Sequence, residues 1–160
     1  MTTRAPGDTN RMTKPDATTS FRVSFDWLSN FFRCDVTLDG EVYRSVEHAF
    51  QAAKTTNPAE RTKVRALASP VFAKRAGKKV TLRSDWKTVK LDVMLGLLRQ
   101  KFAPGSMLAE RLLATGDAHI EEGNHWGDHY WGTVDGKGAN HLGRLLLQVR
   151  KELRGERGQA

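Results

Sequence analysis

The chain has 160 residues and a net charge of +8, and its 39% hydrophobic and 28% charged residues are typical of one globular domain. Its longest apolar runs are tripeptides such as residues 145–147, which excludes a membrane span. The N-terminus lacks the apolar segment of a secretory signal, so we expect no such signal. Cys34 is the only cysteine, which excludes an internal disulfide, so we expect a cytoplasmic protein without a membrane partner.

The first part of the chain divides into two regions. Residues 1–20 contain Thr, Pro and Asp without an apolar period, which predicts a disordered arm before a domain over residues 21–153. From Phe32, apolar and polar residues alternate as in a half-buried strand, and Asp39-Gly40 is a preferred pair for a tight turn. Residues 41–43 can return as a second strand, so we predict a small β-hairpin.

The next segment has the spacing of a helix. Ser45 can cap this helix, and Asn57-Pro58 can end it. Its polar residues Glu47, Gln51 and Lys54 fall at i, i+4 and i+7, so they share one side of the helix. Taken alone, such a line is either a solvated face or the floor of a pocket, and the solvated face is the commoner arrangement.

Residues 61–90 carry the whole positive excess of the chain. They contain ten Lys or Arg and one acid, a net charge of +9, whereas the rest of the chain has 16 basic and 17 acidic residues. Such a block suggests phosphate groups nearby, on a small molecule or a nucleic acid, although a solvated helix surface explains it equally well. Around this block we predict two short helices, over 59–68 and 70–76.

Three further helices are predicted. The first covers residues 85–102 with Ser84 as its cap, and the second covers 106–114 and begins at its own serine cap. The last begins near Asn140, and residues 154–160 form a C-terminal tail. The predicted fold class is therefore α+β, a single compact and mainly helical domain with a small β-hairpin.

Before the last helix, residues 116–139 are rich in Gly and have no apolar period. A loop of this length in a compact domain is usually functional, and its glycines let the backbone approach a ligand closely. Asn124 and Asp128 offer hydrogen-bonding groups, while Trp126 and Trp131 offer flat surfaces on which a base can stack. The alternative is that the two tryptophans only fill the core.

A metal site is another function that this loop could serve. His119, His125 and His129 are possible ligands, together with nearby acids. However, Gly123 and Gly127 argue against a regular helix, and no two-histidine motif is present. We therefore expect neither a metal nor a cofactor.

Five segments of the chain, taken in order, resemble the NADAR family, also called YbiA-like. They are "FDWLSNFF" (25–32), "YRSVEHAFQAAK" (43–54), "LRSDWKTVKLDVM" (82–94), "EGNHWGDHYWG" (122–132) and "GKGANHLGRLLLQVR" (136–150). Each segment is weak alone, but together they are specific and span nearly the whole expected domain. The chain departs from the family at Glu121, where the residue is usually apolar, and this leaves Glu122 as the matching acid.

The resemblance implies a mainly helical α+β domain that acts as an N-glycosidase, cleaving the bond between a ribose C1′ and an amino group on a base-like ring. Two phosphorylated substrate classes are associated with the family: ADP-ribose attached to guanine in nucleic acid, and ribosylaminopyrimidine intermediates of riboflavin biosynthesis. The basic block over 61–90 favours the ADP-ribosyl substrate and possible contact with nucleic acid. The contrasting class is a module that binds ADP-ribose or nucleic acid without cleaving it.

The N-glycosidase reaction that the resemblance implies suggests roles for the motif residues. Cleavage builds positive charge on the ribose, which a carboxylate stabilises, and the departing amine needs a proton. We assign Glu47 and Asp128 to these two roles without deciding between them, and Lys54 could form a Schiff base with the ring-opened sugar if its pKa is lowered. The expected binding residues are Asn30 and Gln51 for the ribose, Asn124 for the ring or sugar, and Trp86, Trp126 or Trp131 for stacking.

Overall fold

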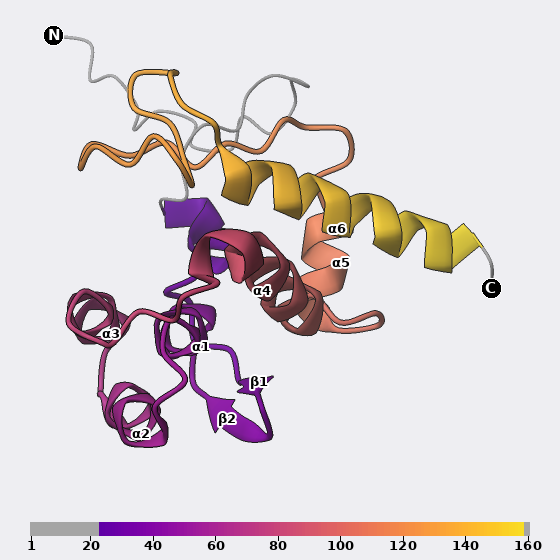
Figure 1. Cartoon of the computed structure of the whole chain (residues 1–160). Coiled ribbons are helices and arrows are strands. Elements are labelled where there is room, and N and C mark those ends of the chain that lie inside the picture. Colours follow the sequence, from indigo (N-terminus) through magenta and orange to yellow (C-terminus); the bar gives the residue numbers. More distant parts are fainter. Residues whose placement is uncertain (1–22, 159–160) are drawn as a thin grey trace, which may run out of the picture.

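The computed structural model describes residues 23–158, in which six α-helices and one two-stranded sheet follow a short 3₁₀ segment (Figure 1). In chain order the elements are η1 (Val23–Leu28), β1 (Val36–Leu38), β2 (Glu41–Tyr43), α1 (Val46–Ala53), α2 (Pro58–Ala66), α3 (Pro70–Gly77), α4 (Trp86–Lys101), α5 (Met107–Ala114) and α6 (His141–Gly158). The predicted α+β fold class is thus confirmed, whereas the predicted arm, residues 1–20, lies outside the described residues. No helix in the described range is long and apolar enough to cross a membrane.

The hairpin forms at the predicted turn, but its first strand is shorter than expected. β1 and β2 pair antiparallel, and Asp39 and Gly40 both take positive φ angles, 47° and 84°, as a tight two-residue hairpin turn requires. The strand begins at Val36 rather than at Phe32. The preceding residues close a turn instead, in which the Phe32 N–H donates to the Ser29 carbonyl.

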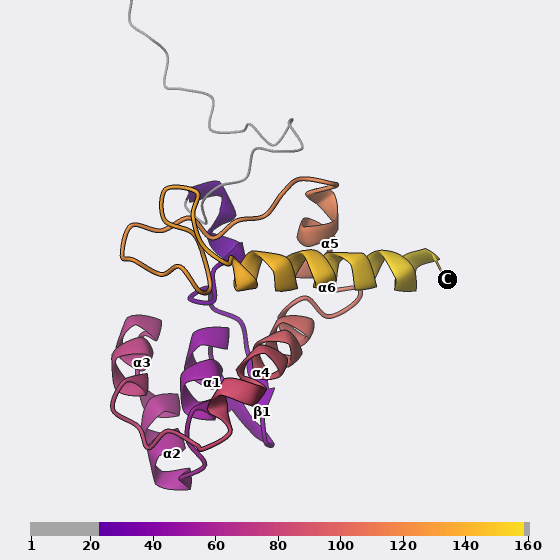
Figure 2. The same ribbon diagram turned by 45° about the horizontal axis from the view of Figure 1, so that its top comes forward.

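α1 lies at the centre of the part of the domain formed by α2, α3, α4 and the hairpin (Figures 1 and 2). It contacts α2, α3, α4 and both strands of the hairpin (Figures 1 and 2). Ser45 caps it as predicted, because its hydroxyl accepts the His48 N–H at 3.1 Å. All eight residues of α1 are buried, so its polar side chains do not form a solvated face.

α4 joins the two parts of the core. It contacts α1 and β1 on one side and α6 on the other, and α5 packs against α6 (Figure 2). The helix is capped by Asp85 and not by Ser84 as predicted. The Asp85 side chain makes no capping bond, since its carboxylate is held by Arg83, with 2.6 Å between Nε and Oδ1.

α6 runs through Gly158, beyond Gly155, so it includes most of the segment in which the sequence predicted a tail. A glycine inside a helix is only about 1 kcal/mol less favourable than alanine, which does not by itself end a helix. Arg150 donates two hydrogen bonds to the segment after α5, and Arg154 forms an ion pair with Asp117 at 3.1 Å. These tertiary contacts anchor the helix beyond its predicted end.

Residues 115–140 connect α5 to α6 as an irregular loop that lies near the start of α6 (Figures 1 and 2). The loop is held together by its own backbone. The Asn124 N–H donates to the Thr133 carbonyl and the Thr133 N–H donates to the Glu122 carbonyl, each at 2.8 Å. The predicted long loop is therefore confirmed, and it has a defined conformation.

Candidate active site

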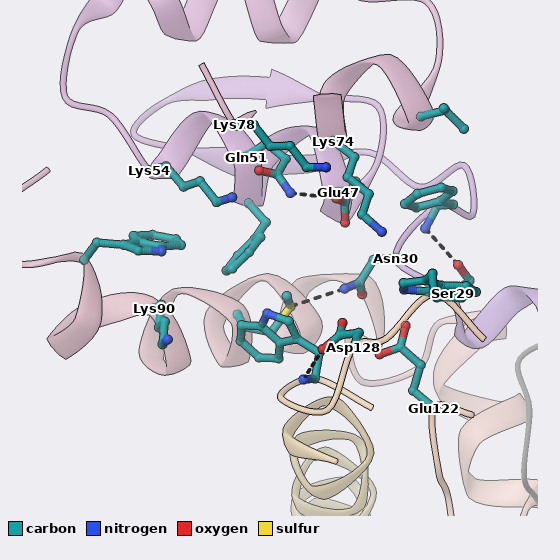
Figure 3. Close-up of a pocket in the computed structure, with 17 residues that line it drawn as sticks. Ser29, Asn30, Glu47, Gln51, Lys54, Lys74, Lys78, Lys90, Glu122 and Asp128 are labelled. Carbon is teal, nitrogen blue, oxygen red and sulfur yellow. Dashed lines mark hydrogen bonds between the residues drawn. The ribbon is translucent and has the colours of Figure 1, made fainter. Parts of the chain in front are cut away.

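A pocket of about 480 Å³ opens between α1, α3, α4, the turn after η1 and the loop 115–140 (Figure 3). This volume lies in the range of small-molecule sites in proteins. Its walls are partly aromatic, and charged side chains from four parts of the chain reach it. These are Glu47 of α1 and Lys54 at its C-terminal cap, Lys74 of α3 and Lys78 at its C-terminal cap, Lys90 of α4, and Glu122 and Asp128 of the loop (Figure 3).

The polar line of α1 forms one wall of this pocket. Glu47 and Gln51 are 7% and 5% exposed, and the Gln51 Nε2 donates to the Glu47 Oε1 at 2.8 Å (Figure 3). α3 packs against Gln51 at Gly77, where an added Cβ would lie 1.8 Å from the Gln51 Oε1. The close packing of α3 thus fixes the amide that in turn holds the Glu47 carboxylate.

The environment changes the titration of both charged residues on this wall. Burial raises the pKa of Glu47, an effect that the Gln51 hydrogen bond and the nearby lysines partly offset. Burial also lowers the pKa of Lys54, and although Glu47 opposes this change, Lys78 and two further lysines add to it. The pocket therefore favours the neutral amine of Lys54 more than water does.

The basic block divides in the structure. Three of its ten cations, Lys74, Lys78 and Lys90, line the pocket. Three others are paired with acids elsewhere on the surface: Arg61 with Asp39, Arg65 with Glu41, and Arg83 with Asp85. The net charge of +9 in this segment therefore overstates the positive charge that a ligand in the pocket meets.

The loop places Asp128 in the pocket and uses Asn124 to hold it there. The Asn124 side chain accepts the Asp128 N–H at 3.0 Å and donates to the Asp128 carbonyl at 2.8 Å. The Asp128 Oδ1 accepts the N–H groups of Tyr130 and Trp131 at 3.0 and 2.9 Å. Asn124 is not among the residues that line the pocket but holds one of them, and its expected contact with a ring or sugar stays a prediction.

The three tryptophans expected to stack all line the pocket. Trp86 and Trp131 pack against Phe50, with ring centroids 5.0 and 5.3 Å away, so they both fill the core and form a wall. Trp126 is 53% exposed, with the Lys74 amine 5.2 Å from its ring centroid. Because Trp126 is both exposed and part of the lining, it stands at the rim of the pocket.

Glu122 is the carboxyl-bearing residue of the pocket that sequence reasoning left out of the site. Its pKa is raised to about 8: burial is the largest cause, Asp128 and Glu47 act in the same direction, and Lys74 opposes them. The signal available in the sequence was the family resemblance, in which Glu122 and not Glu121 is the matching acid. Nothing in the local pattern of the glycine-rich loop distinguishes the direction of its side chain from that of Glu121.

Three buried acceptor atoms of the pocket have no hydrogen-bond partner among the described residues. They are the Asn30 Oδ1, the Gln51 Oε1 and the Glu122 Oε2. Buried polar atoms are almost always paired in native proteins, so atoms left unpaired in a pocket point to a ligand or water that completes them. The ligand expected here carries several hydrogen-bond donors, as a ribose does.

No cluster of three or more His, Cys, Asp or Glu side chains suited to a metal ion occurs within residues 23–158.

Of the nine site residues predicted from the sequence, eight line the pocket. These are Asn30, Glu47, Gln51, Lys54, Trp86, Trp126, Asp128 and Trp131. The structure thus brings together residues that are up to 101 positions apart in the sequence.

Comparison with known proteins gives related sequences and a related structure. An N-glycosidase, YbiA, of Escherichia coli K12 is 39% identical over 129 residues, which cover 79% of this chain and 80% of that protein. A riboflavin biosynthesis protein of Vibrio vulnificus is 38% identical over 130 residues, but these cover 35% of its length and 79% of this chain. The solution structure of E. coli YbiA has a TM-score of 0.78 at 35% identity, covering 91% of this chain and 87% of that one.

An N-glycosidase of Nostoc punctiforme is 35% identical over 133 residues and is matched over 85% of its length. The family model described as the NADAR domain matches residues 18–154, a range that contains every residue lining the pocket. The match therefore covers the fold and the candidate site together. The chain belongs to the NADAR domain family.

Proposed function

We propose that the protein is an N-glycosidase that hydrolyses the bond between C1′ of a phosphorylated ribose and an amino group on a planar ring. One observation carries the proposal: three carboxyl groups and a lysine of lowered pKa converge in one aromatic-walled pocket, together with three further lysines. The names of the relatives as N-glycosidases support the same reaction class.

The carboxylates would act on the charge that develops at C1′. Breaking the C–N bond leaves positive charge on C1′ and the ring oxygen of the sugar, which a nearby carboxylate stabilises. Asp128 is held by two backbone N–H groups and Glu47 by the Gln51 amide, so both carboxylates are fixed before the substrate arrives. Such preorganised groups stabilise a transition state without reorganising during the reaction.

Lys54 offers a covalent route to the same products. A sugar linked through an exocyclic amine can open to an imine, and the neutral Lys54 amine can add to C1′ and expel the ring amine. The resulting Schiff base is then hydrolysed by water, which regenerates the lysine. The lowered pKa of Lys54 raises the fraction of neutral amine that this route needs.

The substrate proposed first is a phosphorylated ribosylaminopyrimidine. The lysines of the pocket suit a phosphorylated ligand, and one relative is named as a riboflavin biosynthesis protein. ADP-ribose on guanine in nucleic acid, the substrate expected from the sequence, is the second candidate. Its support from the basic block is weaker in the structure, but the exposed Trp126 and its lysine at the rim could bind a second ring or phosphate.

Parallel incubation with both substrates tests the proposal. A ribosylaminopyrimidine phosphate and an ADP-ribosylated guanine oligonucleotide are incubated with the protein, and release of the ring or base is followed by mass spectrometry. Cleavage of either substrate supports the N-glycosidase, and the preferred one identifies the class. Binding without cleavage would indicate a binding module instead, and neither binding nor cleavage would refute the proposal.

Substitution of pocket residues tests whether the activity resides in this pocket. We expect Glu47→Gln and Asp128→Asn each to lower kcat/KM by about 100-fold or more, because each replaces a positioned carboxyl group of the pocket by an amide. Asp92→Asn is the matched control, since Asp92 is exposed on α4 and lies outside the pocket lining. Full activity of both pocket variants would show that the site has been placed wrongly.

A further inference from the structure

The main chain of Glu122 is fixed on both sides. Its N–H donates to the Asn140 Oδ1 at 3.0 Å, and its carbonyl accepts the Thr133 N–H at 2.8 Å. Gly132 packs directly against this carbonyl, since an added Cβ there would lie 2.1 Å from the oxygen. With the backbone held in this way, the side chain points into the pocket toward the space that Asp128 also faces (Figure 3).

The Glu122 carboxyl group differs from the other two in its contacts. Oε1 of Glu47 accepts the Gln51 amide, and Oδ1 of Asp128 accepts two backbone N–H groups. The Glu122 Oε2, in contrast, is buried and has no hydrogen-bond partner among the described residues. An ionised carboxylate with a buried, unpaired oxygen is strongly disfavoured, whereas a protonated one can offer its O–H to a ligand.

The charges around Glu122 favour its protonated form as well. From the loop it faces Asp128, from α1 it faces Glu47, and from α3 it faces Lys74, so two negative groups oppose one positive group. A third negative charge among these carboxylates would be repelled, and the group takes up a proton instead. The pKa of about 8 leaves Glu122 protonated at neutral pH.

We propose that Glu122 is the acid that delivers a proton to the departing ring amine, a role that rests on the proposed N-glycosidase activity. As the C1′–N bond breaks, its electron pair passes to nitrogen, and nitrogen takes the proton from the Glu122 carboxyl. Water then adds at C1′ and gives up one proton, which restores the Glu122 carboxyl. The sum is substrate plus water to ribose plus amine, and Glu122 ends the cycle in the protonated form in which it began.

The same proton is needed if Lys54 adds first. In that route the amine of the ring leaves C1′ after the lysine has added, and it still requires a proton to depart. Glu122 therefore serves either route, and the result of trapping Lys54 does not bear on it. In this scheme Glu47 and Asp128 stabilise the positive charge on the sugar, and Glu122 transfers the proton.

Glu122→Gln tests this role with Glu121→Gln as a matched control. Both changes replace a carboxyl by an amide of equal size at neighbouring positions, but the Glu121 side chain lies outside the pocket lining, with an oxygen 3.9 Å from His119. Steady-state kinetics are measured for the wild type and both variants across roughly pH 6 to 9 with the substrate that the wild type cleaves. The Glu122→Gln protein keeps a neutral hydrogen-bond donor but has no proton to release.

We expect Glu122→Gln to lower kcat by about 100-fold or more while KM changes little. The kcat of the wild type and of Glu121→Gln should fall as the pH rises through about 8, the pKa of Glu122, because the acid form is lost there. The residual kcat of Glu122→Gln should lack this alkaline decrease. A kcat near that of the wild type, or an unchanged alkaline decrease in Glu122→Gln, would overturn the role.

The outcome separates this inference from the proposed function. If the wild type cleaves a ribosylamino substrate and Glu122→Gln cleaves it equally well, the reaction stands and only the role of Glu122 falls. If the wild type cleaves neither candidate substrate, the proposed function fails and the assigned proton transfer fails with it. Titration of the Glu122 carboxyl by NMR, as the difference between the wild type and Glu122→Gln, distinguishes a misplaced pKa from a wrong reaction.

Discussion

Lys54 is the single residue on which the covalent route depends. Burial and the neighbouring lysines lower its pKa, which favours a nucleophilic amine, but the same amine could serve only as a cation for a phosphate. Arginine keeps the positive charge and cannot act as a nucleophile at neutral pH. The Lys54→Arg variant therefore separates the two roles.

If Lys54 forms a Schiff base, Lys54→Arg should lower kcat on the order of a thousandfold while KM changes less. Borohydride added during turnover should trap a covalent adduct in the wild type and none in the variant, as detected by the mass of the intact protein. Lys54→Ala, which cannot overpack the pocket, should behave in the same way. Near wild-type turnover of Lys54→Arg without any trapped adduct would leave Lys54 as a cation.

Gly77 matters because of the space it leaves for Gln51. A Cβ at this position would meet the Gln51 side chain at 1.8 Å from Oε1 and 2.6 Å from Cδ, so the amide must move. We expect Gly77→Ala to leave the fold intact, since overpacking of this kind costs about 1–3 kcal/mol. It should also raise KM, because the displaced amide no longer holds Glu47 or meets a ligand.

Gly96→Ala on α4 is the control for this change. An added Cβ at Gly96 meets no heavy atom within 4 Å, so alanine should stabilise the helix by up to about 1 kcal/mol and leave KM unchanged. Urea denaturation and steady-state kinetics of both variants check the pair. An unchanged KM in Gly77→Ala would mean that the position of the Gln51 amide does not matter for binding.

At the residue scale, the sequence predicted the pocket residues on the helix better than those in the loop 115–140. Helical spacing alone placed Glu47, Gln51 and Lys54 on one side, and the structure confirms that they line one pocket. In the loop there is no period to decide which side chains point inward. The loop pattern therefore did not single out Glu122, which lines the pocket, while Asn124, expected to contact the ring or sugar, lies outside the lining and holds Asp128.

At the scale of elements, the loop 115–140 is fastened at its end by Asn140. This residue has a positive φ of 51°, its Oδ1 accepts the Glu122 N–H, and its Nδ2 donates to the Ile120 carbonyl at 3.0 Å. We expect Asn140→Ala to lower the free energy of unfolding by about 2–4 kcal/mol, because it leaves two buried groups unpaired and strains the backbone. Activity should fall with it, since the Glu122 backbone loses its anchor.

Asp135→Ala is the control for the backbone contribution to this loss. Asp135 has the same φ of 51° but is exposed in a turn of the same loop. It should show only the smaller effect of backbone strain and no change in activity. Urea denaturation of both variants, followed by tryptophan fluorescence, measures the difference, and equal destabilisation would contradict the anchoring role of the Asn140 amide.

Local signals located most elements but not all of their ends. The Ser45 and Ser106 caps and the Asp39-Gly40 turn occur as predicted, because each depends on a few neighbouring residues. The starts of β1 and α4 and the ends of α1 and α6 differ from the prediction. α1 ends at Ala53, and Asn57, which was predicted to end it, caps α2 instead. Arg83 holds the Asp85 carboxylate at the start of α4, and Arg154 pairs with Asp117 of the loop near the end of α6.

At the scale of the whole molecule, burial of α1 is what turned a polar helix face into a pocket wall. The sequence of α1 has the same pattern whether its polar side meets water or a ligand. Burial of that side depends on α2, α3 and α4 closing around it, and those helices are set by residues far along the chain. Periodicity alone could not distinguish a solvated face from a pocket wall, and it was the family resemblance that favoured the pocket wall.

Two buried ionisable groups, one acidic and one basic, should make the free energy of unfolding depend on pH. Lys101 is 2% exposed and donates to the Ser29 carbonyl at 2.7 Å, and burial lowers its pKa from 10.5 to about 7. The pKa of Glu122 is raised from 4.5 to about 8. Each group holds its neutral form in the fold and its charged form in the unfolded chain over part of the pH range.

Between pH 4.5 and about 8 the folded protein binds a proton at Glu122 that the unfolded chain does not, so the contribution of Glu122 to stability is present at low pH and is lost as the pH rises. Between about 7 and 10.5 the unfolded chain binds a proton at Lys101 that the folded protein does not, so stability rises with pH there. Together the two groups make their smallest contribution between about pH 7 and 8.

Urea denaturation of the wild type, Glu122→Gln and Lys101→Met across this range tests the opposing slopes. The difference between the wild type and Glu122→Gln should decrease with rising pH up to about 8, and that between the wild type and Lys101→Met should increase above about 7. Differences between proteins cancel the titration of every group that does not interact with the substituted residue, so each slope belongs to that residue and its immediate neighbours. A flat difference curve for either variant would mean that its side chain reaches water in the folded protein and keeps its ordinary pKa.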